Sequence, residues 1–368
     1  MTAEQAVDLV VVGGGAMGLA TAWHAATAGR RVVVFERFGF GHHRGASHGG
    51  ERIFRHAHVD RAYVDMALAA DDGWQRLERW CGRRLIERVG CVEHGAEADV
   101  DRMAQVSAEA GVDTEVVARD DAERRWPGLR FSGDVLFQPG GGWTRAADAL
   151  VALAQAATAG GAVLVPEAPV ASLQVGADGG VRVRVPQGTF VAAAVVVTAG
   201  AWVEALVPDA ALPPLTTTEE QYFLFRPVST PAAERSAPAF IHWDTLARYG
   251  LPAPGGLVKV GEHQAGAATT GDGRTFAIDP ARRRRLLDYV AQWVPGVDPE
   301  PVDAGTCLYT STPSLDFVLD RVGPVVVGGG FSGLGFKYVP EVGRRLAGMA
   351  AGQVAPAPPF TLASHASS

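Results

Sequence analysis

The sequence predicts an α/β protein with two domains, one built on a parallel β-sheet and one richer in antiparallel strands. The first is indicated near the start of the chain, where the apolar run 7–12 leads through the glycine-rich residues 13–18 into a helix-like segment. A strand, a glycine turn and a helix in this order are typical of a Rossmann-like unit. The second is indicated from Leu215 to about Thr306, where short apolar runs such as residues 221–225 favour an antiparallel sheet.

The glycine turn predicts a binding site for a dinucleotide pyrophosphate. Gly13 allows the tight turn, Gly15 lets the backbone approach the phosphates, and Gly18 lets the helix pack close to the strand. The free N–H groups at the helix start then face the anion. A second strand at 31–35 ends in Glu36, whose carboxylate suits ribose hydroxyls and would repel a 2′-phosphate. These residues favour FAD or NAD over NADP, and they do not choose between the two.

The next elements alternate between helices and strands. Residues 63–80 form a predicted amphipathic helix with apolar side chains at helical spacing, namely Ala67, Ala70, Trp74 and Leu77. The alanine-rich stretch 146–160 predicts a second helix. Residues 161–165 and 170–175 are expected to be strands of a second βαβ-like return.

The last part of the chain is expected to return to the parallel sheet. The run 193–197 lacks polar alternation, which indicates a strand buried on both faces, and it ends in another glycine turn at 198–202. Residues 325–330 repeat the strand and glycine turn, and a helix follows at 341–351. The tail from Gln353 is rich in Pro, Ala and Ser and is predicted to be frayed.

Composition excludes several classes of protein. The 368 residues leave room for two domains, and 33 basic against 40 acidic residues argue against a nucleic-acid partner. The one dense basic run, at 282–285, is expected to be a solvated helix face. No signal peptide is visible and the longest apolar stretch, 190–203, is too short to span a bilayer. Three cysteines without paired spacing make the cytoplasm the default location.

Six blocks, in order and over nearly the whole chain, resemble the monomeric sarcosine oxidase and N-methyltryptophan oxidase family, which are FAD-dependent amine oxidases of the D-amino acid oxidase superfamily. The blocks are GGGAMG at 13–18, SHGGERIFRH at 47–56, TAGAW at 198–202, KVGEH at 259–263, CLYT at 307–310 and GFSGLGFK at 330–337. The resemblance implies a p-hydroxybenzoate-hydroxylase-like fold. Its FAD-binding domain would comprise residues 1–90, 146–214 and 308–368, and its substrate domain residues 91–145 and 215–307.

The activity that the resemblance implies is oxidation of a secondary amine, or of an N-methyl or cyclic amino acid, at its C–N bond. FAD takes a hydride equivalent from the carbon beside nitrogen, the imine is hydrolysed, and O2 is reduced to H2O2. Because the cofactor carries the electron chemistry, the protein has to supply positioning and electrostatics. The resemblance also implies a monomer.

The resemblance assigns a set of residues to the cofactor. Cys307 matches the cysteine that carries the flavin through a thioether, although a buried, inert thiol is the commoner fate of a free cysteine. Arg52 matches an arginine packed against the flavin ring. The expected cofactor-binding residues are Gly13, Gly15, Met17, Gly18, Glu36, Arg37, Ser47, His48, Arg52, Val170, Gly200, Trp202, Cys307, Gly330, Phe331, Gly333 and Lys337.

Three further cations match catalytic positions of the family. Arg55 and Lys337 match the pair that holds the substrate carboxylate, Arg through a two-pronged hydrogen bond and Lys as a point charge. Lys259 matches the lysine that promotes the reaction with O2, where a positive charge favours the superoxide-like step.

Tyr249, His263 and Tyr309 match positions that line the substrate pocket, and His263 could equally be a structural histidine. Ser332 lacks the following glycine of a hydrolase nucleophile motif. No metal site is predicted, because no Cys or carboxylate set at ligand spacing accompanies the clustered histidines, which are His42, His43, His48, His56 and His58.

The chain departs from the family pattern at Leu334, Glu262 and Leu251, where histidine, an aromatic residue and a bulkier residue are usual. Less aromatic bulk and an added carboxylate predict a larger or additionally cationic amine rather than sarcosine. Two alternatives remain open. An NAD-dependent dehydrogenase would share the glycine turn but give Cys307 no purpose, and a noncatalytic flavin-bearing redox sensor would lack the carboxylate-binding pair.

Overall fold

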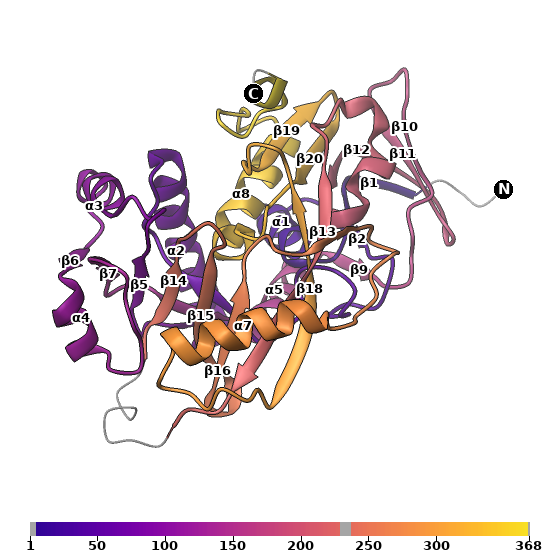
Figure 1. The fold of residues 1–368 in the computed structure, drawn as a ribbon. Helices are drawn as coiled ribbons and strands as arrows, with labels where there is room; N and C mark the ends of the chain where they lie inside the picture. The colour runs from indigo at the N-terminus through magenta and orange to yellow at the C-terminus, as the bar shows by residue number, and fades with distance from the viewer. Residues whose placement is uncertain (1–4, 229–236, 367–368) are drawn as a thin grey trace.

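The computed structural model describes residues 5–228 and 237–366. Within these residues the strands form an eight-stranded sheet, a nine-stranded sheet and a three-stranded sheet, with helices around them (Figure 1). The chain crosses between the two large sheets several times, so that both are assembled from segments far apart in sequence.

The eight-stranded sheet has a parallel centre. β1 (Gln5–Val12) lies between β2 (Val32–Phe35) and β12 (Gly188–Val197), and β9 (Val163–Val165) and β20 (Val325–Gly329) extend the parallel pairing. Leu9 to Val11 and Val195 to Val197 are fully buried, as a parallel sheet covered on both faces requires. This arrangement confirms the predicted Rossmann-like unit.

One strand prediction in this region is wrong. Only β9 joins the parallel sheet, whereas β10 (Ser172–Val175) pairs antiparallel with β11 (Val181–Val185). A tight turn connects these two strands, in which Gly176 N–H donates to Gly180 and Gly179 adopts a positive φ of 81°. A hairpin therefore replaces the expected βαβ return. β19 (Val318–Val322) completes the sheet as the antiparallel neighbour of β20.

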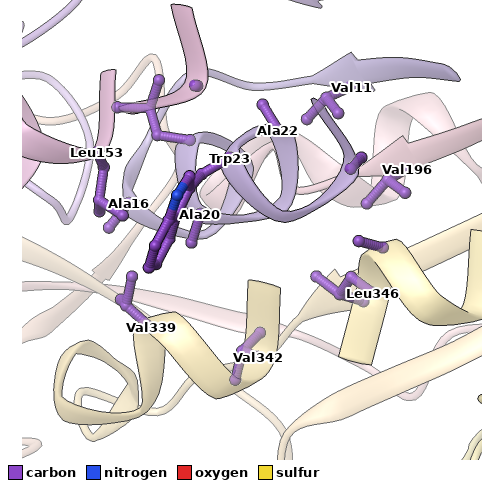
Figure 2. Packing of buried hydrophobic residues seen from close by; sticks show 14 of the residues in the cluster. Val11, Ala16, Ala20, Ala22, Trp23, Leu153, Val196, Val339, Val342 and Leu346 are labelled. Carbon is purple, nitrogen blue, oxygen red and sulfur yellow. The ribbon is translucent and has the colours of Figure 1, made fainter. Parts of the chain in front are cut away.

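Helices α1 (Ala16–Thr27), α5 (Ala146–Ala159) and α8 (Val339–Ala350) cover the parallel strands. Figure 2 shows Trp23 and Ala20 of α1 facing Val339 and Val342 of α8. A Cβ at Gly343 would lie 2.5 Å from the Cβ of Ala20, so glycine permits the close approach of these two helices.

The predicted amphipathic helix is α2 (Arg61–Cys81), with Ala67, Ala70, Trp74 and Leu77 all buried. Trp74 also donates its indole N–H to the carbonyl of Lys337 at 2.8 Å. The indole of Trp74, in the core, thereby fixes the backbone of the 3-10 turn η4 (Gly335–Tyr338). This turn carries the predicted site residue Lys337.

The nine-stranded sheet is mostly antiparallel, as predicted. Its strands are β5 (Cys91–His94), β6 (Glu115–Val117), β7 (Val135–Gln138), β13 (Thr216–Phe225), β14 (Ala239–His242), β15 (Arg248–Ala253), β16 (Leu257–Glu262), β17 (Ala267–Thr269) and β18 (Asp303–Ser311). Helix α7 (Pro280–Trp293) lies across one face of this sheet (Figure 1) and buries Leu286, Tyr289 and Val290 against Phe223 and Val260.

The three-stranded sheet consists of β3 (Glu51–Phe54), β8 (Gly142–Arg145) and β4 (Ile86–Glu87). The remaining elements are α3 (Val100–Glu109), α4 (Arg119–Arg125), η1 (Gly200–Trp202), α6 (Val203–Leu206), η2 (Pro208–Ala210), η3 (Pro254–Gly256) and α9 (Leu362–Ala366).

The prediction that the basic run 282–285 is a solvated face is wrong for Arg282, whereas Arg285 is exposed as predicted and also pairs with a buried carboxylate. Arg282 is buried on α7, where its Nη2 lies 3.4 Å from Oε2 of Glu220. Arg285 donates two hydrogen bonds to the buried carboxylate of Glu262, from Nε at 2.7 Å and from Nη2 at 2.6 Å. These ion pairs attach the helix to the sheet because each satisfies a buried carboxylate.

The prediction of a frayed tail from Gln353 is also wrong as far as residue 366. Phe360 is 2 % exposed and packs against Tyr63 and Phe317, and its carbonyl accepts the N–H of Leu319 at 2.8 Å. One aromatic anchor therefore holds a stretch whose composition suggested disorder.

Candidate active site

A cavity of about 660 Å³ runs from the glycine turn at β1 to the face of the nine-stranded sheet. That volume lies within the range of ligand pockets. Of the residues predicted for cofactor or catalysis, Gly18 alone does not line it. The predicted residues that do are Gly13, Gly15, Met17, Glu36, Arg37, Ser47, His48, Arg52, Arg55, Val170, Gly200, Trp202, Tyr249, Lys259, His263, Cys307, Tyr309, Gly330, Phe331, Gly333 and Lys337.

The glycine turn forms one end of the cavity. Gly13 has a φ of +102°, and a Cβ there would lie 2.6 Å from the carbonyl oxygen of Thr198. A Cβ at Gly18 would collide with the carbonyl of Gly13, so Gly18 serves the packing of α1 on β1 rather than the cavity wall. The start of α1 thus faces open space, and this is the arrangement that binds a pyrophosphate.

Glu36 lies at the end of β2 beside this turn. Its carboxylate accepts the N–H of Gly14 at 2.7 Å and that of Phe38 at 2.9 Å, and it lies 3.3 Å from Nε2 of His42. Burial raises the pKa of Glu36, but the hydrogen bonds from His42, Phe38 and Gly14 outweigh it and leave the pKa below its ordinary value. The carboxylate is therefore charged at neutral pH and can accept hydrogen bonds from ribose hydroxyls.

Arg37 and Trp202, which both line the cavity, share one exposed contact residue, Asp272. Nη1 of Arg37 lies 3.0 Å from Oδ1 of Asp272, and the indole N–H of Trp202 donates to the same oxygen at 3.0 Å. Asp272 lies in the loop between β17 and α7, and nothing in its sequence surroundings pointed to it.

Arg52 and Cys307 meet in the middle of the cavity. The guanidinium of Arg52 donates to the carbonyls of Glu51, Ala46 and His48, and its Nη2 lies 4.0 Å from Sγ of Cys307. The cation therefore lies next to the thiol that the resemblance assigns to the flavin.

His48 lies beside this pair and is neutral. Its ring nitrogens face the carbonyls of Gly45 at 2.8 Å and Thr306 at 3.0 Å. Burial, Arg52 and Arg274 lower the pKa of His48 to about 4. A neutral imidazole carries a single ring N–H, so His48 can donate to only one of these two carbonyls at a time.

Lys259 of β16 is buried at the cavity wall. Its Nζ lies 3.0 Å from Oε1 of Glu51 and 4.0 Å from the ring centre of Tyr222. Burial and the charge of Arg52 lower the pKa of Lys259. The block 47–56 contains Glu51, but sequence reasoning assigned this residue no role.

Arg55 and Lys337 form the cationic part of the far end. Arg55 is 2 % exposed and its Nη1 lies 3.2 Å from Oε1 of Glu93, whose other oxygen accepts the indole N–H of Trp243 at 2.9 Å. In the described part of the chain no carboxylate forms an ion pair with Lys337, whose Nζ lies 3.5 Å from the carbonyl of Leu334. Burial and Arg55 hold the pKa of Lys337 well below its ordinary value. The charge of Glu93 raises the pKa of Lys337 without forming an ion pair with it, so this buried amine beside Arg55 can still favour an anionic ligand.

Polar aromatic groups surround the same end. The rings of His263 and Tyr309 are 5.4 Å apart, and burial, Lys337 and Arg55 lower the pKa of His263 to about 4. Burial also raises the pKa values of Tyr249 and Tyr309, so both phenols stay protonated. These three side chains are neutral groups that can hydrogen-bond a ligand.

The structure corrects the interpretation of Glu262. This residue was expected to add a carboxylate to the substrate pocket, but it is 1 % exposed, does not line the cavity and is bound by Arg285. β16 places Lys259 and Glu262 three residues apart, so their side chains point to opposite faces of the sheet. Leu251 and Leu334, the other two departures, do line the cavity.

The glycine-rich turn after β20 also lines the cavity. Gly330, Ser332 and Gly333 all have positive φ values, of 62°, 49° and 75°. A Cβ at Gly333 would collide with the ring of Tyr309, so glycine is needed for this contact. Ser332 is fully buried and donates its hydroxyl to the carbonyl of Gly330 at 3.1 Å.

Residues 5–228 and 237–366 contain no group of three or more His, Cys, Asp or Glu side chains that could hold a metal ion. Nor does this part of the chain include a helix with the length and apolar character needed to cross a bilayer.

The cavity fits FAD in its shape and in its donors. One end offers the cradle of Gly13 and Gly15 and the charged Glu36, and the middle offers Arg52 and Cys307. A Cβ at Gly15 would approach Oγ of Ser47, which accepts the N–H of Ala16 at 3.0 Å, so this space depends on glycine. The residues that would hold the cofactor are therefore in place along one continuous cavity.

Comparisons with known proteins agree with this fit. The chain matches the FAD dependent oxidoreductase family over residues 8–349. It is 31 % identical to the monomeric sarcosine oxidase of Streptomyces avermitilis over 359 residues, which is 93 % of each chain. It is 28 % identical to an N-methyl-L-tryptophan oxidase of Yersinia pestis, over 92 % of this chain and 93 % of that protein.

Among solved structures, NikD, an amino acid oxidase essential for nikkomycin biosynthesis, is 30 % identical and superimposes with a TM-score of 0.81 over 96 % of this chain and 98 % of its own. These matches confirm the resemblance, the two-domain Rossmann-like flavoprotein fold and an FAD-dependent oxidoreductase, and they favour FAD over the NAD-dependent alternative. The chain belongs to the FAD dependent oxidoreductase family.

Proposed function

We propose that this protein is a flavin-dependent amine oxidase whose substrate is a secondary amine with a carboxylate, namely an N-methyl or cyclic amino acid. The observation that carries the proposal is the pair of buried cations, Arg55 and Lys337, at the end of the cavity away from the nucleotide cradle. A noncatalytic flavin-bearing protein would not need a buried lysine that has no ion-pair partner among the described residues, because such a group costs stability unless an anion binds.

Bound FAD would accept a hydride equivalent from the carbon beside nitrogen, and O2 would be reduced to H2O2. The residues of the chain hold the substrate. Arg55 and Lys337 bind its carboxylate, and the neutral groups of His263 and Tyr309 can hydrogen-bond the amine or the carboxylate. Lys259 supplies a buried positive charge where O2 is reduced.

Amine-dependent bleaching tests the function directly. We expect an amine substrate to remove the yellow colour of the flavin in the absence of O2, and the colour to return with release of H2O2 when O2 is admitted. A flavin-bearing redox sensor would keep its colour with every amine. Absence of flavin absorption from the purified protein would instead revive the NAD-dependent dehydrogenase.

The apolar side chains of the cavity wall favour a substrate with an apolar body. The apolar or aromatic residues Leu251, Leu334, Ile53, Ile241 and Trp243 line the cavity. In a panel of amino and imino acids we expect N-methyl amino acids with long side chains, or cyclic imino acids such as pipecolate and proline, to reduce the flavin faster than sarcosine. Because Glu262 points away, an added positive charge on the amine should bring no advantage. Fastest reduction by sarcosine would contradict this substrate class.

We also propose that Cys307 carries the flavin covalently. Its thiol lines the cavity and lies beside Arg52, a cation that would stabilise negative charge during formation of the link. Precipitated, denatured protein is expected to stay yellow, and the variant Cys307→Ala is expected to release its colour into the supernatant. Cys81→Ala, which removes a thiol outside the cavity, should behave like the unaltered protein. Loss of colour from the unaltered protein would contradict the covalent link.

The remaining parts of the proposal concern organisation. Residues 1–90, 146–214 and 308–368 would form the FAD-binding domain and residues 91–145 and 215–307 the substrate domain, which is supported by the origin of the parallel strands in the first set. The protein would work as a monomer with O2 as its acceptor. A reducing cytoplasm would suit its three free cysteines.

A further inference from the structure

One buried carboxylate of the cavity takes no part in the function proposed above. Glu51, on β3, is 5 % exposed, and its Oε1 lies 3.0 Å from Nζ of Lys259, which is 4 % exposed. Both side chains line the cavity together with Arg52 and Cys307. The ammonium of Lys259 is therefore held between Glu51 and the ring of Tyr222, whose centre is 4.0 Å away.

The charges around this ammonium oppose one another. Burial and Arg52 disfavour its protonated form, whereas Glu51 favours that form through its charge and its hydrogen bond. Cys307 on β18, Tyr222 on β13 and Tyr249 on β15 are further titratable groups that interact electrostatically with the pair or with Arg52 beside it. Within the described residues, Glu51 is the one carboxylate paired with Lys259.

A carboxylate at this position has two consequences for a reaction that adds negative charge to O2. It keeps the neighbouring lysine protonated to higher pH, and its own negative charge opposes the charge that develops on oxygen. The first effect widens the pH range of the reaction, and the second lowers its maximum rate.

We propose that Glu51 is a positioning residue that holds Lys259 in its cationic form. It thereby sets the pH range and the maximum rate of the reaction with O2. The inference rests on the proposed function, in which Lys259 promotes O2 reduction. Glu51 itself passes no proton or electron in this scheme, since it acts through the lysine.

The test separates the two half-reactions. The Glu51→Gln enzyme is reduced without O2 by an amine substrate, then mixed with O2 at a series of pH values, and the second-order rate constant is measured. The fall in rate at alkaline pH should move to lower pH by about one to three pH units. The rate on the plateau below it should rise on the order of tenfold, because a negative charge has been removed. Glu51→Asp should show smaller changes in the same directions, because its shorter side chain weakens the pair.

A second readout does not depend on turnover. The midpoint potential of the bound flavin is expected to rise in Glu51→Gln, since reduction adds negative charge to a cavity that has lost a carboxylate. The matched control is Glu341→Gln, which makes the same change at a buried glutamate paired with Arg344 and Arg345 on α8, outside the cavity. This control should leave the potential and the pH profile as in the unaltered protein.

The outcomes distinguish this inference from the function on which it rests. An unchanged pH profile and potential in Glu51→Gln, with Lys259→Met still slow toward O2, would overturn the role of Glu51 alone. If Lys259→Met reacts with O2 at the normal rate, the proposed role of the lysine fails. If Glu51→Gln does not fold, Glu51→Asp decides the question, and an unchanged profile in that variant counts against the inference.

Discussion

Replacing Lys259 with methionine is expected to slow the reaction of the reduced enzyme with O2 by roughly a hundredfold or more. Methionine keeps much of the length of the side chain but removes a buried positive charge from the cavity wall. Reduction of the flavin by the amine in the absence of O2 should survive, because this step does not require negative charge to develop on oxygen. Stopped-flow measurement of the two half-reactions checks the prediction.

The control for this variant is Arg283→Met. Arg283 is a cation on α7 whose partner is Glu300, 2.6 Å away, and it lies outside the cavity. It should leave both half-reactions unchanged. An equal loss of both half-reactions in Lys259→Met would show that the lysine is needed for the site as a whole and not for the reaction with O2.

Neutralising Lys337 is expected to weaken substrate capture without weakening the fold. A charge-assisted hydrogen bond contributes about 1.5–3 kcal/mol, so Lys337→Met should lower kcat/KM for an acidic substrate by about tenfold to a hundredfold. The carboxamide of the same substrate should lose much less, because it offers no negative charge. The comparison of acid and carboxamide in both enzymes measures the effect.

Although Lys337→Met should bind substrate less well, it should be more stable than the unaltered protein. Lys337 is a buried cation whose pKa is held well below its ordinary value, so its replacement should raise the midpoint of thermal unfolding at neutral pH. At low pH the folded and unfolded states both bind the proton and the cost of burial is complete. As pH rises through the lowered pKa, the unfolded chain binds more protons and the unaltered protein gains stability. The advantage of Lys337→Met should therefore shrink toward alkaline pH.

Arg55→Met is the informative contrast. It should also lower kcat/KM for an acidic substrate, but it leaves the carboxylate of Glu93 buried without its cation. Loss of one partner of a buried pair costs about 3–5 kcal/mol, so this variant should unfold at a lower temperature. Equal stability of the two variants would contradict the view that, among the described residues, Arg55 forms an ion pair and Lys337 does not.

Local patterns predicted a large part of the fold and of the cavity. The glycine turn, the buried strands and the helical spacing of Trp74 and Leu77 depend on backbone conformation and on short-range periodicity, which neighbouring residues determine. The resemblance placed Cys307 and Arg52 in one site, and the structure brings them to 4.0 Å. Patterns of this kind failed where the partner of a side chain is distant in sequence.

Glu262 and Glu51 illustrate that failure. Glu262 appeared to add charge to the substrate pocket, yet its strand turns it toward Arg285 on a helix that follows in the chain. Glu51 stands in the block 47–56 without an assigned role, and only the 3.0 Å distance from its Oε1 to Nζ of Lys259, 208 residues later, gives it one. The tail was predicted to be frayed but is ordered, because the burial of Phe360 against Tyr63 and Phe317 outweighs a composition typical of disorder.

By itself, then, the sequence determined the cofactor-binding unit and the kind of enzyme, because these depend on residues that act in contiguous blocks. Only the tertiary structure decided which charges face the cavity and which are neutralised by ion pairs behind the sheet. It also showed that Lys337 has no ion-pair partner among the described residues. The physical reason is that the pairing energy of a buried charge depends on distances of a few ångströms between strands and helices far apart in the chain.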